Sequence, residues 1–90
     1  MMHRLRGESA SRRYFMDEVE LSPQRSQKVY NHSPDGFSHG YLGSGCAQLA
    51  LAIMLELYPE RIALQKYQRF KFDTIAILPV NKDFDIEFEA

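Results

Sequence analysis

The side chains best suited to chemistry lie in one stretch, where a loop rich in glycine and histidine leads into an almost wholly apolar segment. From Asn31 to Leu57 this stretch is NHSPDGFSHGYLGSGCAQLALAIMLEL. Amides that point out of a helix N-terminus can hold a phosphate without a cationic side chain, and glycine permits close approach of the ligand. The first hypothesis is therefore a site for a phosphorylated or nucleotide-like ligand. Its candidate residues are His32, Ser33, His39, Tyr41, Gly43, Ser44, Gly45 and Cys46.

Each part of the loop has a role in this hypothesis. Backbone amides of residues 43–46 and the hydroxyl of Ser44 would donate hydrogen bonds to an anion, while Tyr41 and His39 would form the walls. In the competing structural interpretation, the two glycines only let the loop pack tightly against a buried helix. A Gly-Ser-Gly triplet before a helix is common and no Gly-Lys-Ser/Thr ending follows, so the sequence leaves both interpretations open.

A catalytic interpretation depends on Cys46, which at a helix N-terminus would have a lowered pKa and would need His32 or His39 as its base. A buried cysteine acting as a small apolar residue is more frequent. Ser33, His32 and Asp35 include the residue types of a hydrolytic triad, but neighbours on one turn rarely point at a common atom. Metal binding by the histidines and Asp35 has equally little support. We expect no catalytic residue, metal or cofactor, and the balance favours a non-enzymatic protein.

A protein-interaction or regulatory module is the alternative function. Tyr30, Phe37 and Tyr41 would anchor a partner if exposed, because aromatic side chains contribute disproportionately at interfaces. The acidic residues of the last predicted strand offer a second surface, suited to a basic partner. Their simpler explanation is that charges on an outer strand keep a sheet edge soluble.

Length and composition set the frame for these sites. Ninety residues predict one compact domain, 1–90, whose first ten residues are frayed, and a hydrophobic content of 44% is enough for a packed core. We expect it to fold alone or as a small homo-oligomer. The apolar run from Cys46 to Tyr58 is too short to cross a bilayer, and the N-terminus lacks a signal-type apolar stretch, so we expect a cytoplasmic protein with no membrane contact.

Charge is unevenly distributed along the chain. Residues 1–30 hold six Arg or Lys against four Asp or Glu, residues 31–60 hold three acids and no base, and residues 61–90 hold five of each. A duplex-binding surface normally collects cations, so this pattern argues against nucleic acid as a partner without excluding it. Arg4, Arg6, Arg12 and Arg13 would form a basic patch only if the N-terminus were ordered, and we expect it to be solvated.

The first half of the chain predicts a hairpin and a turn around the candidate site. Arg13 to Leu21 reads as two short strands about Asp17 and Glu18, because aromatic residues give way to apolar residues that alternate with acids. Residues 22–31 carry a proline and many polar groups without a period, so they are predicted to be a connection. Ser-Pro-Asp-Gly at residues 33–36 is a turn signature, and residues 37–42 are predicted to be extended.

Two helices should follow the loop. Ser44 is the candidate N-cap of a helix that starts near Gly45 or Cys46, and this helix should be central because it is apolar nearly all round. Proline and glutamate at residues 59 and 60 suit the first turn of a second, amphipathic helix that extends to about Phe70. Residues 71–78 fit either a helix or a strand, and we favour a longer helix that ends before Pro79.

The C-terminal element completes the predicted fold. Phe84, Ile86 and Phe88 alternate with acidic residues, which predicts a half-buried strand with an acidic outer face. The expected fold class is α+β, with a small antiparallel sheet made from the N-terminal hairpin and the C-terminal strand. This sheet should pack on the buried central helix and on the second, amphipathic helix.

The segments HSPDGFSHGYLGSGCAQLALAI and YQRFKFDTIAILP resemble a family of small proteins of unknown function from bacteria, archaea and their phages or plasmids. Its members read approximately HSP-x-GF-x-WGY-x-GSGPAQLALAIL and later YQ-x-FK with LP, and the resemblance covers roughly residues 5–88. It adds an interaction or regulatory role of the phage or mobile-element type to the alternatives. His39 stands where the family has tryptophan, Cys46 where it has proline, and Asp17-Glu18 where an Asp-Gly turn is expected. Chemistry at Cys46 would therefore not be common to the family.

Overall fold

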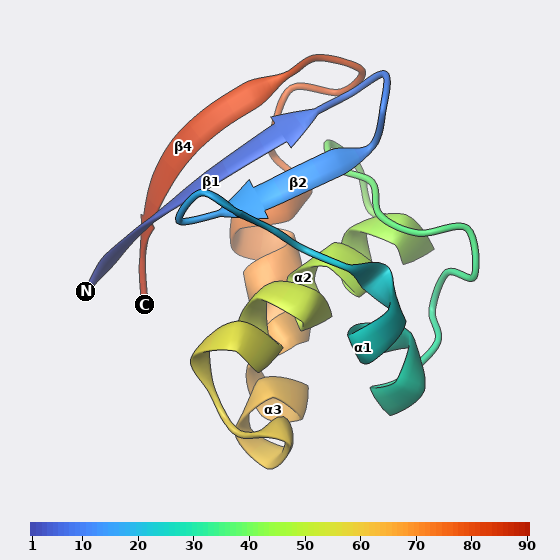
Figure 1. Ribbon diagram of the computed structural model, residues 1–90, viewed down its shortest axis with the longest axis vertical. Coiled ribbons are helices and arrows are strands. Elements are labelled where there is room, and N and C mark those ends of the chain that lie inside the picture. Colours follow the sequence, from blue (N-terminus) through green and yellow to red (C-terminus); the bar gives the residue numbers. More distant parts are fainter.

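The computed structural model describes all 90 residues, and Figure 1 shows the helices gathered on one face of the sheet. The strands are β1 (Met2–Glu8), β2 (Arg13–Met16), β3 (Val19–Glu20) and β4 (Phe84–Glu89), all antiparallel in the order β3-β2-β1-β4. The helices are α1 (Pro23–Val29), α2 (Ser44–Leu57) and α3 (Glu60–Phe70), and α3 continues into a π-helical turn, η1 (Lys71–Ile75). The predicted α+β class is confirmed.

The N-terminus is a central strand and not a frayed end. β1 lies between β2 and β4, with Leu5 fully buried. A Cβ atom on Gly7 would lie 2.3 Å from the ring of Phe84, so only glycine lets the aromatic rings under the sheet approach this strand. The alternating arginines of β1 face outward, and in the sequence they resemble a solvated tail. Their spacing of two is the strand signal that the sequence interpretation did not use.

The hairpin predicted about Asp17 and Glu18 is confirmed as β2 and β3. Both turn residues have a positive φ, of 50° and 71°, in a position where glycine is the usual residue. Hydrogen bonds compensate for the missing glycine: the Asp17 carboxylate accepts from the backbone amide of Arg4 at 2.9 Å and contacts Nδ1 of His3 at 2.7 Å. These two contacts, the amide first, hold the pKa of Asp17 below its usual value.

The predicted connection over residues 22–31 is wrong, because residues 23–29 form α1. Pro23 occupies the first turn, where its missing N–H has no intrahelical partner to lose. Seven residues are too few for a stable isolated helix, so tertiary contacts must hold α1 in place. Ser26 supplies one of them: it is fully buried, and its hydroxyl accepts a hydrogen bond from Nε2 of Gln48 at 2.9 Å.

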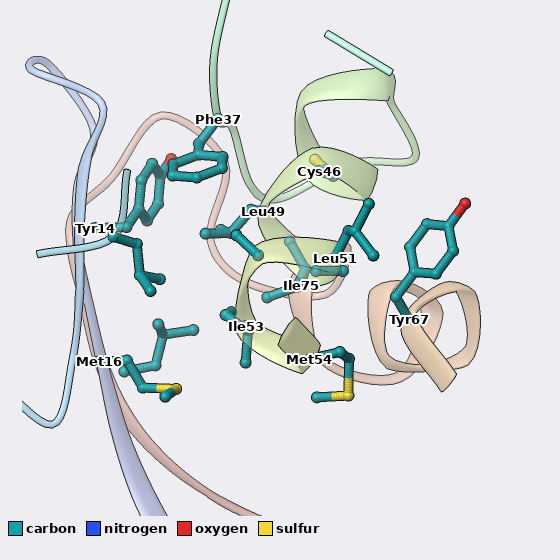
Figure 2. Close-up of a cluster of buried hydrophobic side chains, with 14 of the residues drawn as sticks. Tyr14, Met16, Phe37, Cys46, Leu49, Leu51, Ile53, Met54, Tyr67 and Ile75 are labelled. Atoms are coloured by element: carbon teal, nitrogen blue, oxygen red, sulfur yellow. The ribbon is translucent and has the colours of Figure 1, made fainter. Parts of the chain in front are cut away.

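The central helix is α2, as predicted, and residues 45–55 are all buried. Figure 2 shows Leu49 and Ile53 of α2 between the sheet residues Tyr14 and Met16 on one side and Tyr67 of α3 on the other. The predicted N-cap is wrong by one residue, because the helix begins at Ser44 and its N-cap is glycine 43, which has no side chain to cap it. The predicted helical continuation beyond Phe70 is confirmed over residues 71–75, in π-helical form.

The outer face of the sheet is polar and its charges are paired. Arg4 contacts Asp85 at 2.9 Å through Nε and Glu18 at 2.8 Å, and Arg13 contacts Glu20 at 3.1 Å. The expected acidic outer face of β4 is present, but arginines of β1 stand beside it. Arg4, Arg6 and Arg13 thus form ion pairs along the sheet and do not gather into a basic patch, while Arg12 contacts the carbonyl of Phe37.

Candidate functional site

Gln48 is the buried polar residue that holds the loop of residues 30–33 in place through hydrogen bonds. It is fully buried in α2, and its side-chain oxygen accepts from the backbone amides of His32 at 2.7 Å and Ser33 at 2.9 Å. Its nitrogen donates to Ser26 at 2.9 Å and to the carbonyl of Tyr30 at 3.0 Å. One amide side chain therefore joins α1, the 30–33 loop and α2. Sequence reasoning missed this role, although a lone glutamine in an apolar helix was the available signal.

His39 is sealed inside the protein and does not line an open site. Only 4% of it is exposed, and its ring lies between the hydroxyl of Tyr14 and the carbonyl of Lys82, at 2.7 Å from each. A carbonyl only accepts, so Nε2 carries the hydrogen and Nδ1 accepts from Tyr14. The adjacent hollow measures about 10 Å³, room for no more than a water molecule. This histidine joins β2 to the segment before β4.

His32 lies near the surface in an aromatic cluster. Its ring stacks on Tyr30 with centroids 4.3 Å apart, and its Nε2 lies 2.7 Å from the hydroxyl of Tyr67. Gln68 donates to that hydroxyl at 3.2 Å, so the hydroxyl hydrogen is free to point at His32. Partial burial lowers the pKa of His32. The contacts of this histidine attach the loop to α3. No cavity is lined by both His32 and His39.

The first turn of α2 is open where the loop enters it. The ring of Tyr41 lies against glycine 43, so close that a Cβ there would be 2.2 Å from a ring carbon. Gly45 is buried against Ser38, whose amide donates to the Gly45 carbonyl at 3.1 Å. Ser44 is exposed and makes no side-chain cap. The two glycines thus serve close packing, and the exposed groups of this turn are those of Ser44 and Tyr41.

Cys46 is fully buried at the base of this turn. Burial raises the pKa of its thiol, and the nearby amides of Tyr41 and residue 43 offset this only in part. A raised pKa lowers the thiolate fraction that a nucleophile needs. His39 is not free to act as its base, because Tyr14 and Lys82 occupy both of its ring nitrogens, and Nε2 of His32 is held by the hydroxyl of Tyr67. The structure favours the packing role for Cys46.

The family profile of DUF6166, a family of unknown function, matches residues 3–89. The chain belongs to DUF6166. Searches of curated proteins and of solved structures found no match to it. The matched range contains every strand and helix of the fold except for Met2, the first residue of β1.

In this DUF6166 protein the eight candidate ligand residues do not share a cavity. The hollows of the surface include none lined by His32, Tyr41 or residues 43–46. No group of three His, Cys, Asp or Glu side chains is placed to hold a metal ion. No helix has the length and apolar character needed to span a membrane.

The loop instead contacts a distant segment, and both segments carry exposed apolar side chains. The amide of Gly40 donates to the carbonyl of Ile75 at 3.0 Å, and a Cβ on Gly40 would lie 2.7 Å from the Cα of Val80. The loop and the segment after η1 therefore touch. We call the exposed side chains of these two segments the apolar end, consisting of Tyr41, Leu42, Ile77 and Val80, which are between 47% and 76% exposed.

Sequence reasoning identified only Tyr41 of the apolar end. Tyr30 is exposed as expected of an anchor, but its ring stacks on His32, whereas Phe37 is buried against Tyr14. Leu42 and Ile77 lie far apart in the sequence, so their spacing carried no signal. Only the contacts of Gly40 with Ile75 and Val80 show that their two segments are neighbours.

Proposed function

We propose that this protein is a non-enzymatic interaction module that binds a protein partner through the apolar end. The observation that carries the proposal is the exposure of four large apolar side chains on two touching segments, with Ile77 at 76% and Leu42 at 62%. Exposed apolar groups that gather in one place are typical of interaction sites, whereas scattered ones need no explanation.

The rigidity of the apolar end supports the same proposal. Gly40 fixes its backbone on the later segment, and the two histidines and Gln48 hold the loop from beneath. A surface held in this way loses little conformational entropy when a partner binds. Four side chains bury roughly a few hundred Å², which suits a weak and transient complex more than a permanent one.

Site-specific photo-crosslinking tests the proposal. A photoreactive amino acid at position 42, used in extract of the protein's own host, should give one dominant protein adduct. We expect Ile77→Ser to reduce the adduct at least about fivefold, because it removes an exposed apolar contact. The same substitution should change the free energy of unfolding by less than about 0.5 kcal/mol, since the side chain is at the surface.

The control places the same photoreactive group at Lys28, an exposed residue of α1 outside the apolar end. It should give no dominant adduct. Equal adducts from both positions, or an adduct unaffected by Ile77→Ser, would reject the apolar end as the binding surface. An adduct between two copies of the chain would identify a second copy as the partner.

An anion at the start of α2 is the second candidate, favoured by the first helical turn, which has no side-chain cap. Such a turn leaves amide donors free for a phosphate. In this proposal the eight sequence-predicted residues act mainly through backbone groups of residues 43–46, with Tyr41 beside them. The sealed position of His39 removes one of the two predicted walls.

Two substitutions at Ser44 distinguish the contribution of its backbone amide to anion binding from that of its hydroxyl. Ser44→Pro removes the amide at the first helical position, where proline is tolerated, and the preceding residue has φ −141° and ψ 171°, which proline accepts. If an anion binds there, millimolar phosphate or nucleotide should raise the unfolding temperature of the parent protein and of Ser44→Ala, but not of Ser44→Pro. The absence of any shift in the parent would reject this candidate.

A further inference from the structure

The strand β4 has an unpaired edge. The sheet order places it outermost, with β1 on its other side, as Figure 1 shows. Just beyond the strand, the amide of Ala90 donates to the carbonyl of Met1 at 3.1 Å. In an antiparallel ladder, pairs that exchange backbone hydrogen bonds alternate with pairs that do not. Ala90 belongs to a hydrogen-bonded pair, so the backbone groups of the even-numbered residues of β4 bond to β1. The backbone groups of Asp85, Glu87 and Glu89 therefore point to the open edge.

The side chains along this edge favour a basic neighbour. Asp85, Glu87 and Glu89 are exposed on the outer face of the sheet. In β1, Arg4 stands opposite Glu87 and Arg6 opposite Asp85. The fold thus already pairs β4 with a strand that carries arginine at alternate positions, and opposite charges across strands are stabilising. Asp85 is already ion-paired with Arg4, and Glu89 with the N-terminal ammonium, so a strand that joined at the open side would meet Glu87 as the unpaired acid and would share the other two.

A hollow beside the end of β4 leaves room for those side chains of an added strand that point toward the helices. It measures about 370 Å³ and lies between Glu89 and Ala90 at the end of the sheet and residues 65–73 of α3 and η1. Met54, Tyr58 and Phe70 form its apolar part. An added strand would direct every second side chain toward the helices, at the level of this hollow. The rest of the lining is polar, with Gln65, Lys66, Arg69 and Asp73, so apolar side chains of the added strand would contact only its apolar part.

We propose that β4 binds an extended segment of a partner protein as a fifth strand, with basic residues at alternate positions and apolar residues between them. Backbone hydrogen bonds supply the attachment, and the acids of β4 select the charge pattern. Directly opposite residues lie on the same face of a sheet, so a second copy of β4 would place acids against acids. The edge is separate from the apolar end, and neither proposal depends on the other.

A short peptide provides the test. A fluorescent seven-residue peptide with valine at odd positions and arginine at even positions should bind the protein, measured by fluorescence anisotropy. Replacement of its arginines by glutamate should abolish binding. In the protein, Glu87→Pro removes one amide that faces the open edge and keeps the bonds to β1, and proline is tolerated on that side of an edge strand. We expect at least about tenfold weaker binding of the arginine peptide.

Glu87→Gln is the matched control, because it removes the charge and keeps the amide. We expect about threefold weaker binding, the size of an exposed charge contact. Hydrogen exchange of the parent protein adds a measurement that needs no variant: the peptide should slow exchange of the amides of Asp85, Glu87 and Glu89. Equal binding of the glutamate peptide, no binding at millimolar peptide, or unchanged exchange at the three amides would overturn the proposal. A dimer of the protein that Glu87→Pro dissociates would also overturn it, in favour of self-pairing.

Discussion

Gln48→Leu should destabilise the protein by about 4 kcal/mol, because it leaves buried polar groups of the loop and α1 without partners. Leucine fills nearly the same volume, so the loss reports the hydrogen bonds and not a cavity. The amide of Ser33 would lose its acceptor, and that of His32 would keep only the Tyr30 carbonyl at 3.2 Å. The hydroxyl of Ser26 and the carbonyl of Tyr30 would each lose a donor. Urea unfolding followed by circular dichroism measures the change. It is a large share of the about 5–15 kcal/mol that stabilises a domain.

Gln65→Leu is the control for the same chemical change at an exposed position of α3. Its stability should stay within about 0.5 kcal/mol of the parent. Native-state hydrogen exchange locates the effect: in Gln48→Leu the amides of His32 and Ser33 should exchange freely, while those between β1 and β4 stay protected up to global unfolding. A loss below about 1 kcal/mol in Gln48→Leu would show that the loop is held by other contacts.

The sequence predicted those elements whose own residues show a complete helical or alternating pattern of apolar side chains. α2 is an apolar run long enough to be a buried helix, and β4 alternates strictly between aromatic or aliphatic residues and acids. α1 was missed because seven residues, one of them proline, are too few for a helical period to show. β1 was missed because Arg4 and Arg6 suggested a solvated end, whereas their partners Asp85 and Glu87 lie in β4, at the other end of the chain.

The candidate site was less predictable because its contacts are long-range. His39 is defined by Tyr14, 25 residues before it, and by Lys82, 43 residues after it. Nothing near His39 in the sequence indicates that both ring nitrogens are occupied inside the protein. The sequence located the loop and placed the helix start one or two residues too late, but it could not tell which side chains face inward. Side-chain direction in an irregular loop depends on the surfaces that it meets, and those surfaces come from β2, α3 and the segment before β4.

Gly40→Ala should destabilise the protein by about 3 kcal/mol and disrupt the apolar end. Gly40 has a φ of 88°, a region that strains alanine by about 1–2 kcal/mol. The new Cβ would also lie 2.7 Å from the Cα of Val80 and 2.9 Å from the carbonyl oxygen of Leu78. Both are backbone atoms and cannot turn aside as a flexible side chain can, so the two segments must separate. Thermal and urea unfolding measure the stability, and reduced crosslinking from position 42 would report the disrupted surface.

Gly36→Ala separates the two causes of this loss. Gly36 also has a positive φ, of 107°, but nothing lies within 4 Å of a Cβ placed there. It should therefore show the backbone strain alone, about 1 kcal/mol, and leave crosslinking from position 42 unchanged. The difference between the two variants measures the close approach of Gly40 to the segment of Leu78 and Val80. If both lose the same stability, that approach contributes nothing, and the apolar end is not held together by Gly40.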